Sequence, residues 1–149
     1  MMATNKTTFT TPATTPSSRD SSLSLPKNKN EKLVFLAGGI GITPFRSMIQ
    51  YLIDTKDKRA VTLLYSNKTV NDVAYREIFD RAQRLFGIKT FYALNRIDAK
   101  TIVEQVPDYK DRKFYLSGPR GMVTGFENLL QSLDIKKNNI KTDFFPGFA

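Results

Sequence analysis

A glycine-rich turn early in the chain has the composition of a phosphate-binding segment. Its seven residues are Gly38, Gly39, Ile40, Gly41, Ile42, Thr43 and Pro44. Glycine lets the backbone turn tightly and approach a ligand closely, and the unpaired N–H groups that open the next helix attract an anion. We expect Thr43 to cap that helix and Pro44 to occupy its first position.

The alternative for this turn is a tight strand-to-helix connection without a ligand. The segment lacks the third glycine of the G-x-G-x-x-G dinucleotide fingerprint, because Pro44 follows Thr43 directly. It does lie between an apolar run and an expected helix, which is the context that nucleotide binding requires. We therefore predict that the turn binds the pyrophosphate of a nucleotide.

A second polar segment, Ser66-Asn67-Lys68, follows the next apolar run. In dinucleotide-binding folds an acidic residue at this point grips a ribose 2′-hydroxyl, whereas a basic residue suits a 2′-phosphate. No acid occurs in the segment, and Lys68 and Arg76 are available. The composition therefore favours NADPH over NADH. The alternative is a solvated turn with a surface lysine.

A third segment follows the fourth apolar run and holds Ser117, Gly118, Pro119 and Met122. Glycine again falls where an expected strand gives way to a helix. A sheet of Rossmann-like order would bring this point beside the first glycine turn. We expect the two turns to share one ligand; the alternative is a helix entry in which Met122 is only a core residue.

The elements that must position these segments alternate along the chain from Lys32. Strands are expected at residues 33–37, 60–66, 88–94, 113–117 and 139–145, and helices at 44–53, 72–86, 99–106 and 121–133. The pattern predicts the α/β class, with a Rossmann-like parallel five-stranded sheet and helices on both faces. Ligands of such sheets bind beyond the carboxyl ends of the strands.

The second expected helix has a clear amphipathic pattern. Its apolar residues form one stripe at helical spacing: Tyr75, Ile78, Phe79, Ala82, Leu85 and Phe86. Gly87 is expected to end this helix, and Asp98 to cap the following one.

Composition excludes several kinds of chemistry. The chain has no cysteine and no histidine, which rules out disulfides, thiol nucleophiles, a Ser-His-Asp triad and zinc sites built on those residues. No acidic cluster supports a carboxylate metal site. The net charge of +9 favours an acidic partner, whether a nucleic acid, an anionic lipid, a phosphate-rich ligand or an acidic protein.

Residues 1–30 are expected to form a disordered tail rich in threonine and serine, and residues 31–149 a single folded domain. The tail lacks the apolar run of a signal peptide, and no stretch is apolar enough to span a membrane. Its hydroxyl-rich composition faintly resembles a transit peptide, but Lys6 and Arg19 are its only basic residues before residue 23. We expect a cytoplasmic protein.

Four motifs occur in order along the chain: Gly38–Phe45, Leu64–Lys68, Phe114–Pro119 with Met122, and Asp143–Phe148. Together they resemble the NAD(P)-binding half of the ferredoxin–NADP(+) reductase family, over roughly Leu25 to the C-terminus. Members of that family pass a hydride between a nicotinamide and a bound flavin. The flavin then exchanges single electrons with a ferredoxin, an iron–sulfur domain or haem.

The resemblance implies that NAD(P)H is the cofactor. The turn Gly39–Pro44 would hold the pyrophosphate and the nicotinamide side. Ser66 and Lys68 would hold the adenosine end, and Gly118 and Pro119 would line the nicotinamide slot.

Three residues correspond to catalytic positions of the family. Ser117 stands where members usually have a cysteine close to the nicotinamide. Asp143 stands where an acidic residue is common in the last strand, and has a shorter side chain. Phe145 matches the aromatic ring that often covers the flavin, although Phe148 is an alternative.

The flavin-binding half of the family has no counterpart before Glu31. The chain alone is therefore not expected to bind FAD, and the implied partners are a flavin-binding domain or subunit and an acidic ferredoxin-type acceptor. One alternative is a non-catalytic nucleotide-binding or regulatory module. A nucleic-acid binder is a weaker alternative, because the lysines are scattered in the sequence and no nucleic-acid motif is present.

Overall fold

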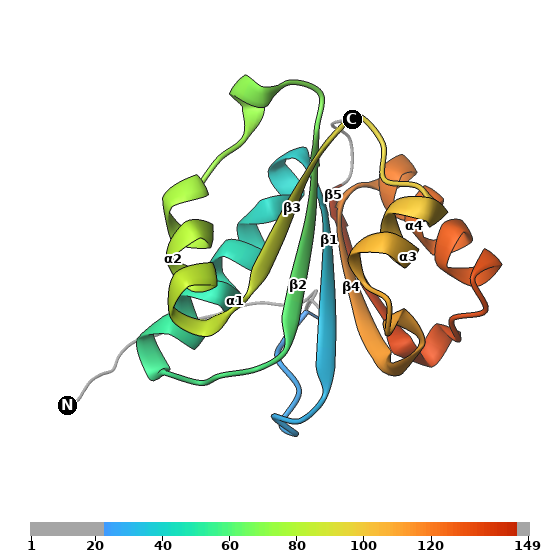
Figure 1. The fold of residues 1–149 in the computed structure, drawn as a ribbon. Helices are drawn as coiled ribbons and strands as arrows, with labels where there is room; N and C mark the ends of the chain where they lie inside the picture. The colour runs from blue at the N-terminus through green and yellow to red at the C-terminus, as the bar shows by residue number, and fades with distance from the viewer. Residues whose placement is uncertain (1–22, 146–149) are drawn as a thin grey trace.

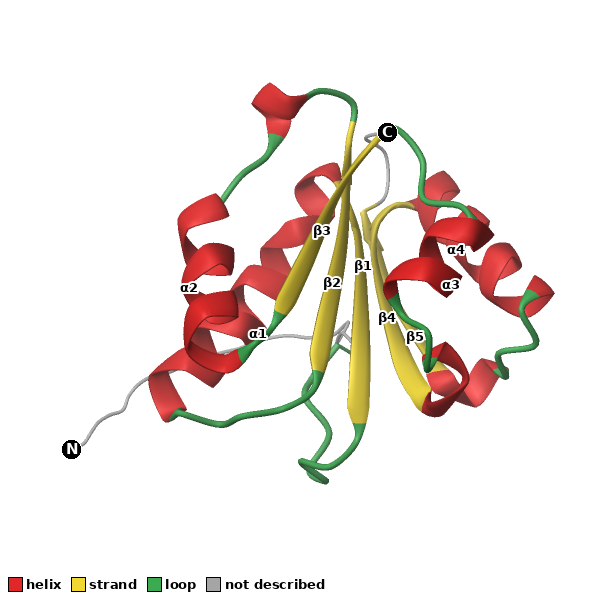
Figure 2. Ribbon diagram, viewed as in Figure 1, coloured by secondary structure: helices red, strands yellow, loops and turns green. Residues whose placement is uncertain are grey.

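Five parallel strands form one sheet in the computed structural model, which describes residues 23–145. The strand order is β3-β2-β1-β4-β5. The strands are β1 (Lys32–Gly38), β2 (Val61–Asn67), β3 (Lys89–Leu94), β4 (Arg112–Pro119) and β5 (Ile140–Phe145). The sheet lies in the middle of the molecule with helices on either side (Figure 1 and Figure 2).

The helices cover the two faces of the sheet in pairs. They are α1 (Ile42–Thr55) and α2 (Arg76–Phe86) on one face, and α3 (Ala99–Gln105) and α4 (Arg120–Ser132) on the other. Short 3-10 turns occur at η2 (Gly39–Gly41), η3 (Val70–Asp72), η4 (Tyr109–Asp111) and η5 (Lys137–Asn139). The arrangement confirms the predicted α/β class and the parallel five-stranded sheet.

The central strand β1 is buried on both faces, as a parallel sheet covered by helices requires. On the α1 face, the ring of Phe35 stacks on Phe45 with centroids 4.5 Å apart, and on Tyr115 at 5.7 Å. On the other face, Val34 and Leu36 belong to the core beneath α3 and α4. The continuous apolar run in the sequence reflects this two-sided burial.

The helix α1 begins two residues earlier than the sequence indicates. Gly41 is its N-cap, and no side chain caps the helix. The prediction that Thr43 caps the helix is therefore wrong, and Pro44 is its third residue rather than its first. Glycine serves as the cap because the β4 backbone lies too close for a side chain at position 41.

The helix α2 begins at Arg76, four residues later than predicted. The chain forms η3 and then an extended stretch before it, and Tyr75 adopts φ of 63° directly before the helix. Tyr75 and Leu85 are therefore wrongly assigned to the apolar stripe, since they are 42% and 53% exposed. Gly87 ends the helix at φ of 70°, as predicted.

Residues 23–30, an entry segment that the sequence analysis placed in the tail, pack on the folded domain. Leu23 and Leu25 contact the core beneath α1. The Tyr115 hydroxyl donates to the Ser24 carbonyl at 2.8 Å, and Arg59 donates to the Pro26 carbonyl at 2.6 Å. Residues 1–22, the rest of the expected tail, lie outside the described residues.

Candidate functional site

β1 ends in a glycine turn that leads directly into α1. Gly39 has φ of 54°, in the left-handed region that favours glycine. No side chain caps the 14-residue α1 at Gly41. The Ile42 N–H donates back to the Gly39 carbonyl in η2, and Pro44 has no N–H. The positive end of the helix dipole and the open backbone at Gly39 therefore favour an anion at the carboxyl edge of the sheet.

The end of β4 packs directly against this turn. A Cβ atom added at Gly41 would lie 2.2 Å from the Ser117 carbonyl oxygen and 2.6 Å from the Gly118 nitrogen. A Cβ atom at Gly118 would lie 3.3 Å from the Gly38 carbonyl oxygen. The two glycine segments are therefore neighbours, as the sequence analysis predicted; Gly41 has no room for a side chain, and Gly118 has little.

Met122, the third residue of α4, covers the end of β1. A Cβ atom at Gly38 would lie 1.7 Å from the Met122 sulfur. Met122 also lines both cavities described below. It is therefore a wall of the candidate site as well as a packing residue.

A cavity of about 690 Å³ opens along this edge. The predicted site residues that line it are Gly38, Gly39, Ile40, Thr43, Ser66, Asn67, Lys68, Pro119 and Met122. Ile42 of the glycine turn also lines it, and six further lining residues were missed by the sequence analysis: Tyr65, Asp72, Ala74, Tyr75, Asn95 and Arg96. Gly41, Pro44 and Gly118 do not line the cavity; Gly41 and Gly118 instead form the close contact between the turns.

The charged groups around this cavity differ from the expected set. Lys68 lines it, but the guanidinium of Arg76 lies 4.1 Å from the centroid of the Tyr92 ring, and Arg76 does not line the cavity. Burial raises the pKa of the Tyr92 hydroxyl, which Arg76 opposes. A carboxylate is present instead, because η3 brings Asp72 back to the cavity, where the Thr69 hydroxyl donates to it at 3.1 Å.

The loop after β3 closes the cavity beside the end of β2. Asn95 adopts φ of 75°, and its N–H donates to the Asn67 carbonyl at 2.7 Å. The Ser66 hydroxyl donates to the Asn95 carbonyl. The Ser66 hydroxyl is thus engaged within the protein, so its expected contact with a ligand would use its remaining acceptor capacity or require it to turn.

The Asn67 side chain carries an unused donor at the cavity. The side-chain nitrogen is buried and has no hydrogen-bond partner among the described residues. A buried amide without a partner is costly unless a ligand or water satisfies it. Among the predicted site residues it is therefore the clearest candidate for a polar contact with a ligand.

The three predicted catalytic residues lie on adjacent strands. Ser117 pairs with Asp143 in the sheet register, and Pro119 with Phe145. Ser117 is fully buried, and its hydroxyl has no partner within the described part of the chain. Asp143 is half-buried. Neither Ser117 nor Asp143 lines the cavity, and Phe148 lies outside the described residues.

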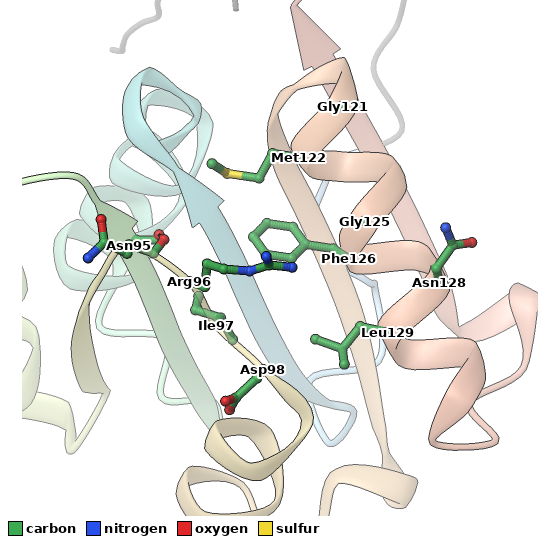
Figure 3. A pocket seen from close by; sticks show the side chains of 11 residues that line it. Asn95, Arg96, Ile97, Asp98, Gly121, Met122, Gly125, Phe126, Asn128 and Leu129 are labelled. Carbon is green, nitrogen blue, oxygen red and sulfur yellow. The ribbon is translucent and has the colours of Figure 1, made fainter.

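A second cavity of about 620 Å³ continues from the first, between the loop after β3 and α4 (Figure 3). The two cavities share Ser66, Asn95, Arg96 and Met122. The Arg96 side chain extends across the opening toward Phe126 (Figure 3). The two cavities together form a groove that runs from the glycine turn across the end of β2 onto α4.

Asp98 lies at the far end of this second cavity. Its carboxylate accepts the Thr101 backbone N–H at 2.9 Å, which confirms the predicted cap of α3. This backbone hydrogen bond, followed by one from the Thr101 hydroxyl, lowers the pKa of Asp98. The Asp98 carboxylate is therefore occupied in capping α3.

Among residues 23–145 no helix is long and apolar enough to cross a membrane. The same part of the chain contains no group of three or more acidic residues that could hold a metal ion.

The fold and the glycine-lined edge define a Rossmann-like nucleotide-binding domain. A family model described as the oxidoreductase NAD-binding domain matches residues 35–128, and the chain belongs to that family. The flavohemoprotein of Oceanobacillus iheyensis is 26% identical over 134 residues, which cover 81% of this chain and 33% of that protein. The family match confirms the predicted family and its nicotinamide-dinucleotide cofactor.

Solved structures share the fold. The flavohem-like FAD/NAD-binding domain of nitric oxide dioxygenase from Vibrio cholerae aligns with a TM-score of 0.73 at 19% identity, over 86% of this chain and 55% of that chain. Ferredoxin-NADP+ reductase from Plasmodium falciparum aligns with a TM-score of 0.66 at 17% identity, over 81% and 57%. This chain spans about a third of the length of the curated relatives it matches.

Proposed function

We propose that this domain binds NAD(P)H and positions the nicotinamide for hydride transfer to a flavin held by a separate flavin-binding domain or subunit. The observation that carries the proposal is the contact of the glycine turn with the end of β4, where Gly41 leaves no room for a side chain. The contact brings two backbone segments, each at the start of a helix, to one edge of the sheet. This geometry suits a ligand with an anionic centre and two flat ends.

The residues at this edge fit a dinucleotide. A Cβ atom at Gly39 would meet nothing within 4 Å, so the backbone there is open to a ligand. The side-chain nitrogen of Asn67 is a buried donor without a partner. The cavity of about 690 Å³ is within the usual size range of a cofactor site. The turn and the start of α1 would hold the pyrophosphate.

The nicotinamide end would lie beside Pro119 and the end of β4. A reduced nicotinamide supplies a hydride when it is bound, and transfer then depends mainly on the distance and alignment of the reacting atoms. Gly118 would allow the ring to approach the backbone. Ser117, Asp143 and Phe145 would orient it or the flavin, because they lie near the carboxyl ends of two adjacent strands, where Ser117 pairs with Asp143 and Pro119 with Phe145.

The adenosine end would lie at Ser66, Asn67 and Lys68, with Tyr75 as an exposed ring at the cavity wall. The sequence favours NADPH, but Arg76 packs on Tyr92 and Asp72 lines the cavity. A carboxylate suits a free 2′-hydroxyl and repels a 2′-phosphate. We therefore infer a preference for NADH, with Lys68 and Arg96 as the cationic lining residues that oppose it.

Electron transfer onward requires partners. FAD belongs to the flavin-binding domain, since the described residues form only the one sheet and its covering helices. An acidic ferredoxin-type protein is the proposed acceptor, by analogy with the ferredoxin-NADP+ reductase whose fold this domain shares. A cytoplasmic location fits this set of partners.

Calorimetric titration of the purified chain with NADH and NADPH tests the binding step. We expect saturable binding with a Kd well below about 1 mM. Gly39→Ala and Gly87→Ala form a matched pair, because both glycines have positive φ and neither Cβ would meet an atom within 4 Å. Only Gly39 lines the cavity. Weaker binding in Gly39→Ala alone supports the site, and equal effects of both variants contradict it.

The burial of Ser117 away from the cavity favours a second candidate, a module that binds the nucleotide without catalysis. An experiment that adds the flavin domain of a relative to the NADH-loaded chain distinguishes the hydride-transfer domain from the non-catalytic module. Reduction of the flavin supports hydride transfer. Binding without flavin reduction supports the non-catalytic module.

A further inference from the structure

The net positive charge of this domain is concentrated at the amino ends of the strands, opposite the nucleotide edge. We define the basic end as the residues that enter and begin the five strands, namely 27–32, 56–60, 87–89, 108–113 and 134–141. These ranges hold 13 basic and 5 acidic residues, a net charge of +8. The rest of residues 23–145 holds 8 of each sign and is neutral. Figure 1 shows the loops that enter the strands together at the lower side of the molecule.

Most of the basic side chains at this end are exposed lysines. They are Lys27, Lys29, Lys56, Lys58, Lys89, Lys110, Lys136 and Lys137. Acidic neighbours offset few of them. Lys29 lies 4.0 Å from Asp57, which is also bonded to Arg59. Asp108 is bonded to Lys32 and Arg112, and Glu31 to Lys113. The remaining two acidic residues, Asp111 and Asp134, are exposed.

The two arginines of the basic end point inward. Arg59 is buried and bonds Asp57 and the Pro26 carbonyl. Arg112 bonds Asp108 and the Leu33 carbonyl at 3.0 Å. The outer surface therefore presents lysine ammonium groups, which act as hydrated point charges. It lacks the planar guanidinium groups that form bidentate hydrogen bonds with phosphates or bases.

The basic end also has no large exposed hydrophobic side chain among its described residues. Protein interfaces are depleted of lysine at their centres and rely on buried aromatic anchors. A surface of lysines without apolar anchors suits a partner whose negative charges are mobile and spread over a plane. An anionic lipid surface has this property, and it attracts clustered lysines without insertion.

We propose that the basic end docks the domain peripherally on an anionic lipid surface. A depression of about 310 Å³ lies within it, with Lys32, Lys110, Arg112 and Lys113 on its walls beside the carboxylates of Glu31 and Asp111, so the attraction rests on the exposed lysines around it. The strands have six to eight residues, so the nucleotide edge would stand about 20 Å above the docked end. Docking would therefore leave the dinucleotide groove open to the solvent.

Co-sedimentation with vesicles tests the proposal. Vesicles contain either phosphatidylcholine alone or about one-third phosphatidylserine, at about 0.1 M salt. We expect binding only to the anionic vesicles, with a loss of at least tenfold when the salt is raised to about 0.5 M. Equal binding to both vesicle types, or none to either, overturns the proposal.

Two double variants sharpen the test. Lys136→Gln with Lys137→Gln removes two charges from the basic end and should weaken vesicle binding at least tenfold, since each lysine near such a surface contributes about fivefold. Arg81→Gln with Lys100→Gln removes the same charge from exposed positions outside it and should change binding less than threefold. Equal losses in both, or tighter binding to short duplex DNA than to the anionic vesicles, contradict lipid docking. Thermal unfolding and NADH titration check that both double variants remain folded.

Discussion

The two edges of the sheet provide contrasting surfaces. The carboxyl edge carries the glycine turns and the exposed side chains Ile40, Val70, Tyr75 and Leu94, and the described residues outside the basic end have no net charge. The amino edge carries the net charge of the described residues and no large exposed hydrophobic side chain. A ligand with flat rings suits the first edge, and a diffuse anionic surface suits the second.

The contrast shows how a parallel sheet separates two tasks. Because all strands run the same way, every strand-to-helix turn lies at one edge and every helix-to-strand turn at the other. Tight backbone geometry is needed at the first edge, whereas the second tolerates long polar side chains. Substitutions at the two edges should therefore affect different properties.

The largest expected effect is at the amino edge, in the buried pair of Arg59 and Asp57, whose side chains are 5% and 7% exposed. Arg59→Met should lower the free energy of unfolding by about 3–5 kcal/mol, because the Asp57 carboxylate stays buried without its partner. Urea unfolding curves measure this loss of unfolding free energy. Asp57→Leu combined with Arg59→Met should recover most of the loss. NADH affinity of the folded fraction should not change.

Gly41→Val should damage both stability and binding at the carboxyl edge. Its Cβ would meet the β4 backbone at 2.2 Å, and we expect a loss of about 3 kcal/mol in unfolding free energy. NADH binding should fall at least tenfold, because the turn must move away from β4. Gly87→Ala is the control, since nothing lies within 4 Å of its Cβ and Gly87 lines neither cavity. A Gly41→Val protein with unchanged stability would refute the close contact.

Asp72→Asn should alter specificity without altering stability. Removing the carboxylate from the cavity should raise the NADPH affinity relative to NADH by about tenfold, or about 1.4 kcal/mol. Lys68→Gln should shift the ratio the opposite way. Paired titrations with both nucleotides measure the ratio. An unchanged ratio in both variants would place the 2′ position elsewhere in the groove.

The smallest expected effect is a pH dependence at the amino edge. The Lys32 ammonium, which donates to Asp108 at 2.7 Å, and then Arg112 lower the pKa of that carboxyl. A lowered folded pKa stabilises the protein above the unfolded value of about 3.9, and this contribution is lost as the pH falls through the folded value.

Asp108→Asn should therefore cost up to about 1 kcal/mol at neutral pH, because the carboxyl is partly exposed. The difference from the wild type should shrink below about pH 4. Unfolding curves at several pH values measure it. A difference that stays constant across this range would mean that packing, rather than charge, is responsible.

Sequence reasoning succeeded where local pattern and tertiary environment agree. The apolar run of β1 is buried on both faces, and Gly87 and Asp98 end and begin helices as their types predict. Gly118 was placed beside the first turn because the strand order follows from the alternation of elements.

Sequence reasoning failed where contacts with a segment distant in the sequence determine a residue's role. Thr43 has the right type to cap α1, but the β4 backbone allows only glycine at the cap. Asp72 lies five residues beyond β2, and only the turn η3 returns it to the cavity. Arg76 has the right charge for a phosphate, but the Tyr92 ring holds it.

The lysines illustrate the same limit for surfaces. They are scattered in the sequence, and the sequence analysis drew no site from them. The topology gathers them, because loops that are some 25 residues apart in the chain meet at one edge. Only the order and direction of the strands reveal this concentration of charge.

The entry segment has a consequence for where the chain can be shortened. A fragment that starts at Glu31 would leave Arg59 without the Pro26 carbonyl and the Tyr115 hydroxyl without the Ser24 carbonyl. It would also uncover the apolar surface that Leu23 and Leu25 shield. A fragment that starts at Glu31 should therefore be less stable than one that starts at Leu23, and a protease that cuts within residues 25–27 should loosen the domain without cutting its sheet.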